Sequence, residues 1–386
     1  MPAALSVSVT WPRTVAALLL LFTVLGCMNV PTPGLVTKRP LVGAIRWDAW
    51  HGDKSTVGQE VTRSLSPQRY HFRLPFFARV ISPDVVRIKG YSQAIVDDEI
   101  RWASQAGIDY WAFLAYDPDD PMLEALNFYL RSSRKKDIRF CLILEGSRMQ
   151  LGADQDAQIR RLVDFQRDEQ YVRVEGNRPL LYVGLFQSDW LNSHGGAAGL
   201  RPWFDALRQK TSSLGLPEPY VVIMDFDPVR GAKLAKTVEA DAISSYATDG
   251  GASRGSYAQL AQHTERFWER CRNTGVPVVP LVMSGWDRRP RIERPVSWES
   301  YQKPGEGLDR YYETATPAQL ADHLRKALDW TTLFADVCPA RTVLIYAWNE
   351  NDEGGWIVPT LNADGSTNAA RLRAIGETLR AWKPPR

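Results

Sequence analysis

The segment RFCLILEG (139–146) is a short apolar run that ends in a carboxylate. It lacks the polar alternation of a half-exposed strand, so it is typical of a strand that is buried on both faces of a parallel sheet. Strands and helix-like stretches of this kind, repeated eight times over about 340 residues, predict a (β/α)8 TIM barrel in a single domain, 41–386. Seven further apolar runs complete the set: 41–47, 109–116, 178–186, 219–226, 240–247, 277–286 and 342–348.

The stretches between these runs carry a helical period. In 93–107 and 316–334 apolar residues recur at steps of three and four, and Gly107 stands where a helix-ending glycine is expected. A doubly wound open sheet is the alternative fold, but it requires a glycine-rich phosphate loop after its first strand, and the sequence has none there. The longer spans 48–108 and 287–307 predict excursions in addition to helices.

The N-terminal segment is distinct from the barrel. Arg13 precedes the apolar run 14–26, which is too short for a comfortable transmembrane helix and has the proportions of a signal peptide. Cys27 follows a small residue, as in a bacterial lipobox, so we predict a signal peptide (1–26), lipidation of Cys27 and a proline-containing tether (27–40). Ordinary cleavage nearby and an uncleaved anchor are the alternatives. The protein is thus expected to be exported as a membrane-anchored lipoprotein that faces the periplasm or the cell exterior.

The composition narrows the classes of partner. A net charge of +3 over 386 residues suggests neither nucleic acid nor an anionic membrane surface. The 14 Trp, 14 Tyr and 13 Phe residues fit either core packing or the stacking of sugar rings on aromatic faces. Cys141 is expected to be a buried free thiol. No cysteine pair has zinc-ligand spacing, so we predict no metal and no cofactor.

A TIM barrel gathers its functional groups at the carboxyl ends of its strands. Acids and aromatics follow nearly every apolar run, which suits a polyhydroxylated substrate. For His51 a purely structural role is equally compatible with the sequence, and Asp225 could equally cap the next helix. The candidate substrate-binding residues are Trp47, Asp48, His51, Tyr116, Glu145, Asp225, Tyr246, Trp286, Asp287, Trp348 and Asn349.

The segment AWNENDEGGW (347–356) gathers three acids where the last strand ends. Strand alternation predicts that Glu350 points into the barrel mouth together with Trp348 and Tyr346. Glu353 must then be brought back beside Glu350 by a curled loop. Neighbouring carboxylates raise each other's pKa, and cleavage of a glycosidic bond needs one protonated and one ionised carboxyl group. A solvated acidic turn between two packing tryptophans is the alternative interpretation.

The segment AWNENDEGGWIVPT (347–360) resembles the C-terminal signature of the glycoside hydrolase family 99-like (WbsX-like) proteins. In that family a Trp-Asn-Glu element is followed three residues later by Glu-Gly and then by an apolar-x-Pro step. Further segments resemble the family in the expected order: 107–117, 171–186, 283–291 and 316–330.

This resemblance implies catalysis by Glu350 and Glu353 on an α-mannoside-type substrate with retention. In the family the first glutamate acts as a base on the 2-hydroxyl of the substrate, and the second is the general acid/base. The family usually has an aromatic residue between the glutamates, whereas this chain has Asn351 and Asp352. The extra acid is expected to shift the pKa of Glu353.

The sequence therefore predicts an exported glycoside hydrolase that acts on an α-linked, mannan-like oligosaccharide or polysaccharide. We expect no nucleic acid partner and contact with the membrane only through the N-terminal lipid. Two alternatives stay open: a glycan-binding surface lipoprotein without catalysis, and a glycosyltransferase of the cell envelope.

Overall fold

The computed structural model describes residues 38–51, 54–303 and 305–385. The predicted signal peptide, the lipidation of Cys27 and most of the tether lie outside these residues. Arg39, which we assigned to the tether, already belongs to the folded part: its Nη1 lies 2.5 Å from Asp109 Oδ2, and its Nη2 donates to the carbonyl of Gly107 at 2.8 Å. The folded part of the chain therefore includes residue 39.

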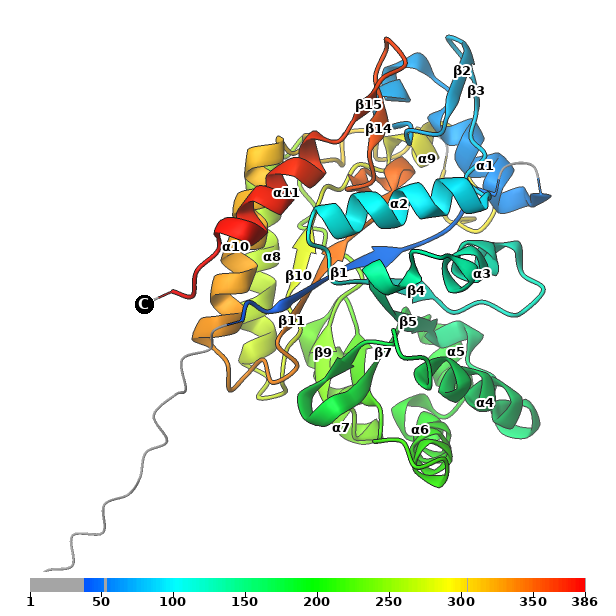
Figure 1. The fold of residues 1–386 in the computed structure, drawn as a ribbon. Coiled ribbons are helices and arrows are strands. Elements are labelled where there is room, and N and C mark those ends of the chain that lie inside the picture. Colours follow the sequence, from blue (N-terminus) through cyan, green and yellow to red (C-terminus); the bar gives the residue numbers. More distant parts are fainter. Residues whose placement is uncertain (1–37, 52–53, 304, 386) are drawn as a thin grey trace, which may run out of the picture. The chain divides into compact units, whose positions relative to one another are not determined.

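Within the described residues, eight parallel strands form the barrel, and each lies inside one of the eight predicted apolar runs (Figure 1). The strands are hydrogen-bonded in the order β10-β11-β1-β4-β5-β7-β8-β9. Between β9 and β10 the barrel is joined by a parallel bridge from Ile243 to Val278. The predicted TIM barrel is confirmed. The barrel strands are β1 (Leu41–Arg46), β4 (Tyr110–Leu114), β5 (Arg139–Glu145), β7 (Arg178–Gly184), β8 (Tyr220–Met224), β9 (Ala242–Ser244), β10 (Leu281–Met283) and β11 (Thr342–Tyr346).

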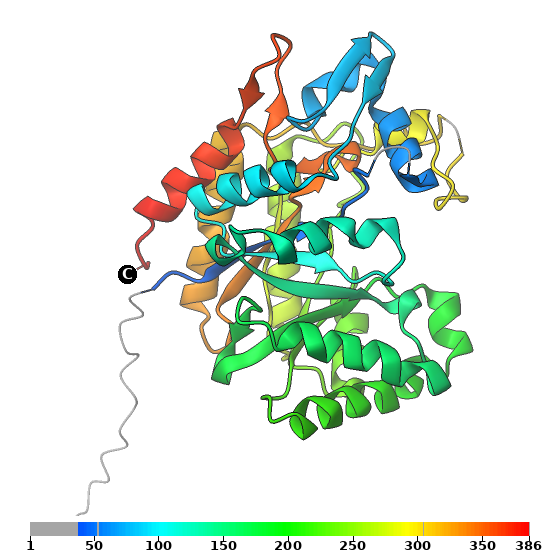
Figure 2. The ribbon, with the colours of Figure 1, turned by 45° about the vertical axis from the view of Figure 1, so that its right-hand side comes forward.

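Helices alternate with these strands and cover the outside of the barrel (Figures 1 and 2). Their ends follow local sequence signals: Ser92 accepts a hydrogen bond from the Ile95 N–H at the start of α2, and Gly107 follows that helix with a φ of +77°. The helices are α1 (Thr56–Leu65), α2 (Gln93–Gln105), α3 (Glu124–Arg131), α4 (Gln155–Gln166), α5 (Ser188–Ser193), α6 (Gly196–Ser213), α7 (Pro228–Val238), α8 (Tyr257–Arg272), α9 (Arg289–Glu293), α10 (Pro317–Leu333) and α11 (Ala370–Ala381).

The predicted excursions lie between β1 and β4 and between β10 and β11, and short antiparallel elements follow β11. The first excursion carries α1, a 3-10 helix and a hairpin, and the second carries α9 and an irregular segment. The short elements are η2 (Gln68–Arg73), β2 (Arg79–Ser82), β3 (Val85–Arg87), β6 (Arg173–Val174), β12 (Asn349–Glu350), η8 (Asn351–Glu353), β13 (Gly355–Trp356), β14 (Thr360–Leu361) and β15 (Thr367–Asn368).

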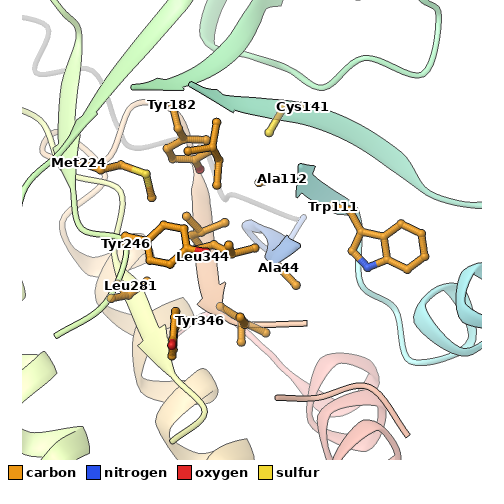
Figure 3. Close-up of a cluster of buried hydrophobic side chains, with 14 of the residues drawn as sticks. Ala44, Trp111, Ala112, Cys141, Tyr182, Met224, Tyr246, Leu281, Leu344 and Tyr346 are labelled. Carbon is orange, nitrogen blue, oxygen red and sulfur yellow. The ribbon is translucent and has the colours of Figure 1, made fainter. Parts of the chain in front are cut away.

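Large side chains fill the interior of the barrel (Figure 3). The Tyr110 hydroxyl lies 2.9 Å from both the Tyr182 hydroxyl and Thr342 Oγ1, so the polar end of this buried ring is paired. Leu344 and Tyr346 point inward from β11, as strand alternation predicts. Cys141 is a buried free thiol, as predicted, and burial raises its pKa.

Residues 38–51, 54–303 and 305–385 contain no candidate membrane span and no candidate metal site. No helix there has both the length and the apolar character needed to cross a membrane. No group of three or more His, Cys, Asp and Glu side chains there is arranged to hold a metal ion.

Candidate active site

The segment after β11 folds back as a tight hairpin, which is the curl that the sequence required. Asn349 and Glu350 pair with Trp356 and Gly355, and η8 forms the turn between them. Gly354 ends the turn with a φ of +86°, a conformation that favours glycine. A Cβ at Gly355 would lie 2.2 Å from the Tyr346 ring, so this position also requires glycine.

Glu350 and Glu353 line one cavity of about 490 Å3 at the carboxyl ends of the barrel strands. This volume lies in the range of about 300–1,000 Å3 that is usual for small-molecule sites. Of the predicted substrate-binding residues, the cavity brings together six: Trp47, Tyr116, Glu145, Asp225, Tyr246 and Trp286. It does not include Asp48, His51, Asp287, Trp348 and Asn349.

Glu350 is buried, and its two oxygens have different surroundings. Oε1 accepts a hydrogen bond from the Tyr246 hydroxyl at 2.6 Å. Oε2 has no hydrogen-bond partner among the described residues, and its nearest cation, Arg291 Nη2, lies 3.5 Å away. Burial and then the charge of Glu353 raise the pKa of Glu350 well above its ordinary value, against the opposing charge of Arg291. Of the pair, Glu350 is therefore the glutamate whose surroundings favour the protonated form.

Glu353 is held as an anion. Its Oε1 lies 2.5 Å from Arg291 Nη1 and 3.2 Å from Arg288 Nε, and its Oε2 accepts a hydrogen bond from the Tyr346 hydroxyl. Burial acts to raise the pKa of Glu353, but the charges of Arg291 and Arg288 and the Tyr346 hydrogen bond outweigh it, so the pKa is lowered. The surroundings of the two glutamates thus shift their pKa values in opposite directions beside one cavity.

Asp352 is bound to Arg291 beside the two glutamates. Its side chain is fully buried, and its Oδ2 accepts a hydrogen bond from Arg291 Nε at 2.7 Å. Its charge contributes to the raised pKa of Glu350. The leading influences on the pKa of Glu353 are burial and the two arginines. The extra acid therefore acts on the pKa of Glu350, and its expected influence on Glu353 stays a prediction.

Asn349 and Asp48 lie behind the cavity wall and hold Trp47. Asn349 Oδ1 accepts a hydrogen bond from the Trp47 backbone N–H at 2.9 Å, and its Nδ2 donates to Asp48 Oδ1 at 3.1 Å. Trp47 Nε1 donates to the Tyr116 hydroxyl at 2.8 Å. Burial raises the pKa of Asp48 to about 6, despite the neighbouring Arg46. Both residues position an aromatic wall and do not face the cavity themselves.

Trp348 contradicts the strand-alternation prediction. Its side chain is fully buried, its Nε1 donates to Glu99 Oε1 at 2.9 Å, and its ring centroid lies 5.1 Å from that of Trp111. Strand β11 ends at Tyr346, so the alternation of faces does not extend to residue 348. Trp348 packs under helix α2 and does not line the cavity.

Asp287 is a support for the hairpin. Arg73 and Arg289 bind its carboxylate, and its backbone N–H donates to the Glu353 carbonyl at 2.6 Å. Burial acts to raise the pKa of Asp287, but the hydrogen bond from Arg289 and the charge of Arg73 outweigh it and lower the pKa. The predicted contact with substrate is replaced by this structural role.

His51 is also buried away from the main cavity. Its Nε2 lies 3.2 Å from Met122 Sδ, and its Nδ1 lies 3.2 Å from Ser55 Oγ. These contacts correspond to the structural alternative that the sequence left open, and burial lowers the pKa of the ring.

The arginines are the functional residues that sequence reasoning missed. Arg288 and Arg291 line the cavity, and so do Trp298, Glu299 and Tyr301 from the irregular segment that follows α9. The segment 283–291 resembles the family, but the resemblance implied no role for either arginine. Arg291 lies in an excursion where no strand end marks it, whereas Arg288 follows Asp287 at the end of a predicted run, where acids and aromatics are the expected candidates.

Together, these observations define a TIM barrel with two buried glutamates beside a cavity at the carboxyl ends of its strands. The structure is similar to that of the GH99 endo-alpha-mannosidase from Bacteroides thetaiotaomicron in complex with BIS-TRIS-propane, with a TM-score of 0.57 and 14% identity over 89% of this chain and 97% of that one. A second structure of a GH99 endo-alpha-mannosidase from that organism gives a TM-score of 0.51 with 15% identity and the same coverage. The predicted resemblance is confirmed for the fold.

A weaker likeness is to Saccharomyces cerevisiae Gas2p in complex with laminaripentaose, with a TM-score of 0.41 and 12% identity over 78% of this chain and 62% of that one. That score is too low to support an argument. No protein-family model and no curated protein sequence matches the chain.

Proposed function

We propose that this protein is a glycoside hydrolase that cleaves an α-linked glycan, mannan-like or related, with Glu350 and Glu353 as its catalytic pair. The observation that carries this proposal is the pair itself: two buried carboxyl groups border one cavity, one with a raised and one with a lowered pKa. Glycosidic bond cleavage needs this division between a proton donor and a carboxylate.

The surroundings of the two side chains support Glu350 as the proton donor and Glu353 as the carboxylate. Glu350 Oε2 has no hydrogen-bond partner within the described residues, so its proton can be donated to the leaving oxygen of a sugar in the cavity. Glu353 is ionised and can act as base or nucleophile. The resemblance implies the reverse roles, with Glu350 as the base and Glu353 as the general acid/base. A comparison of an alkyl glycoside with a glycosyl fluoride separates the two assignments.

The walls of the cavity favour a carbohydrate. Trp47, Trp286 and Trp298 offer flat aromatic faces, while Glu145 and Asp225 offer carboxylates to hydroxyl groups. The α-linkage is proposed from the similarity of the fold to that of an endo-alpha-mannosidase. Retention of the anomeric configuration is proposed from the resemblance alone.

The test is a screen of the purified protein against α-mannans, α-glucans and bacterial polysaccharides, with the product anomer followed by NMR. We expect release of reducing sugar from an α-linked substrate, and loss of that release in Glu350→Gln and Glu353→Gln. Circular dichroism should show that both variants are folded. Full activity in either folded variant would contradict the proposed pair.

A glycan-binding protein without catalysis is a second candidate, and one observation favours it. Both oxygens of Glu353 are engaged, by two arginines and by Tyr346, so this carboxylate is less available than a reacting group usually is. Glycan-array binding without turnover, unchanged in both glutamine variants, would support this candidate.

We further propose that the protein is exported and anchored to a bacterial membrane by a lipid on Cys27. The support is the sequence of the N-terminal segment: an apolar run, a small residue and then cysteine. A substrate outside the cytoplasm agrees with a polysaccharide-cleaving role.

A further inference from the structure

One guanidinium group contacts all the acids on the hairpin side of the cavity. In the described part of the chain, Arg291 is within 4 Å of four carboxyl groups. Its Nε lies 2.7 Å from Asp352 Oδ2, and its Nη1 lies 2.5 Å from Glu353 Oε1 and 3.0 Å from Glu299 Oε1. Its Nη2 lies 3.5 Å from Glu350 Oε2.

The contacts of Arg291 are unequal in a way that separates the glutamates. Glu353 receives a hydrogen bond from Arg291, whereas the approach to Glu350 is too long for one, and both Nη2 and Oε2 lack hydrogen-bond partners among the described residues. The side chain of Arg291 is only 5% exposed, so solvent screens these interactions weakly.

We propose that Arg291 is a positioning residue that determines which glutamate of the pair carries the proton, and that Asp352 holds its guanidinium in place. The consequence for turnover rests on the proposed function; the consequence for protonation does not. Glu353, bonded directly, keeps its negative charge. Glu350, close to Glu353 and Asp352 and at a longer distance from the cation, keeps its proton.

Charge counting agrees with this assignment. Four carboxyl groups, of Glu299, Glu350, Asp352 and Glu353, face two described guanidinium groups, of Arg288 and Arg291. Full ionisation would leave two uncompensated negative charges in a buried cluster, and one proton on Glu350 reduces that excess to one.

Other charged and titratable groups near α9 have partners of their own. On its far side, Glu293 is bound by Arg69 and by the Tyr70 hydroxyl. At its start, Asp287 is bound by Arg73 and Arg289. Toward the cavity, Tyr246 and Tyr346 donate to Glu350 and Glu353. Across the cavity, Asp225 is bound by Arg230 and Glu145 by Arg148.

The experiment is a titration of the purified protein labelled with 13C at the glutamate side-chain carboxyl. Glu350→Gln and Glu353→Gln assign the two resonances. In the wild-type protein we expect Glu353 to titrate below, and Glu350 above, the ordinary range of a glutamate. Arg291→Gln should move the Glu353 titration upward, and Arg291→Lys should move it less because the charge is kept. Asp352→Asn should move the Glu350 titration downward, since the charge of Asp352 favours its proton.

Arg178→Gln is the matched control. Arg178 is bonded to Asp241 at 2.6 Å at the opposite end of the barrel, so its loss tests the effect of breaking an ion pair as such. This variant should move neither glutamate resonance. An unchanged Glu353 titration in folded Arg291→Gln would overturn the proposal. If that variant does not fold, an unchanged Glu350 titration in Asp352→Asn would do so.

The titration does not depend on turnover, so it separates this inference from the proposed function. If a glycan substrate is found, kcat/KM of Arg291→Gln should fall by about 100-fold or more, the lower range for loss of an acid-base group. The pH profile of kcat/KM should shift in the direction of the NMR titration. A lower kcat/KM with an unshifted pH profile would indicate a merely structural role and would refute the inference.

Discussion

Replacement of each glutamate by glutamine gives the sharpest test, because the structure predicts different costs for two changes of the same size. In Glu350→Gln the amide oxygen can still accept the hydrogen bond from Tyr246, and Oε2 makes no hydrogen bond that could be lost. We expect the free energy of unfolding at neutral pH to fall by less than about 1 kcal/mol, as for a substitution that breaks no buried network. In Glu353→Gln, Arg288 and Arg291 lose a shared anion, and breaking a buried ion pair costs about 3–5 kcal/mol.

The same two variants separate the catalytic roles. A general acid contributes about 10²–10⁴ in rate, which corresponds to about 3–5 kcal/mol of barrier at 1.36 kcal/mol per tenfold. That contribution matters only when the leaving group needs a proton. If Glu350 is the acid, Glu350→Gln should lose this factor on an alkyl glycoside and keep most of its activity on the glycosyl fluoride of the same sugar. Glu353→Gln should lose activity on both.

The assay combines urea unfolding, followed by tryptophan fluorescence, with kcat/KM on the alkyl glycoside and the fluoride. Glu145→Gln, on the far wall of the cavity, is the control: we expect it to change KM without changing the ratio between the two substrates. Recovery on the fluoride by Glu353→Gln in place of Glu350→Gln would refute the order proposed here and support the one that the resemblance implies. A loss of stability of 3 kcal/mol or more in Glu350→Gln, the cost of a broken buried pair, would refute the account of its surroundings.

Three further predictions follow from the same contacts. The folded pKa of Glu350 is raised, so its stabilising contribution is complete below the unfolded pKa and is lost as the pH rises through the folded value. The folded pKa of Glu353 is lowered, so its contribution is present above the unfolded pKa and is lost as the pH falls through the folded value. The free energy of unfolding, measured with urea from about pH 3 to 9, should therefore depend less on pH on the alkaline side in Glu350→Gln and on the acid side in Glu353→Gln. A pH dependence equal to that of the wild-type protein would contradict this. Asn349→Ala should destabilise the protein by about 2 kcal/mol or more and raise KM, because the buried Trp47 N–H loses its acceptor, and a wild-type urea midpoint would argue against that role. Cys27→Ser should abolish labelling by radioactive palmitate and release the protein from membranes; retained labelling would exclude lipidation at this residue.

The fold could be predicted because each barrel strand is buried on both faces and therefore reads as an unbroken apolar run. Segment 139–146 shows this directly, since β5 occupies Arg139–Glu145. The pairing of Glu350 and Glu353 at one cavity could also be predicted, because the end of the last strand and the following glycines leave few paths for the chain. The prediction for Trp348 was wrong because strand alternation holds only while the strand lasts.

Arg291 could not be predicted in the same way. It is about 60 residues from Asp352 and Glu353, in a short helix within an excursion, and no period or strand end marks it. Three other residues stand near a strand end, where substrate contacts are expected, but their side chains hold neighbouring segments together. These residues are Asp48, Asp287 and Asn349. Positional rules locate the rim of a barrel, whereas side-chain direction depends on partners that are distant in sequence.

The sparse pairing between β9 and β10 has a consequence for local opening of the barrel. Strands β9 and β10 have three residues each. In the described chain this seam is joined by the bridge from Ile243 to Val278, which lies just before β10. The seam therefore has fewer ladder hydrogen bonds than the pair of strands β4 and β5. Local opening takes place where backbone pairing is sparse, and amide protons at the seam should therefore exchange with deuterium before those of β5. Tyr246 comes shortly after β9 in the chain, and Arg291 comes after β10. Local opening of this seam would draw the Tyr246 hydroxyl away from Glu350 Oε1 while the hydrogen bonds between the other barrel strands stay in place.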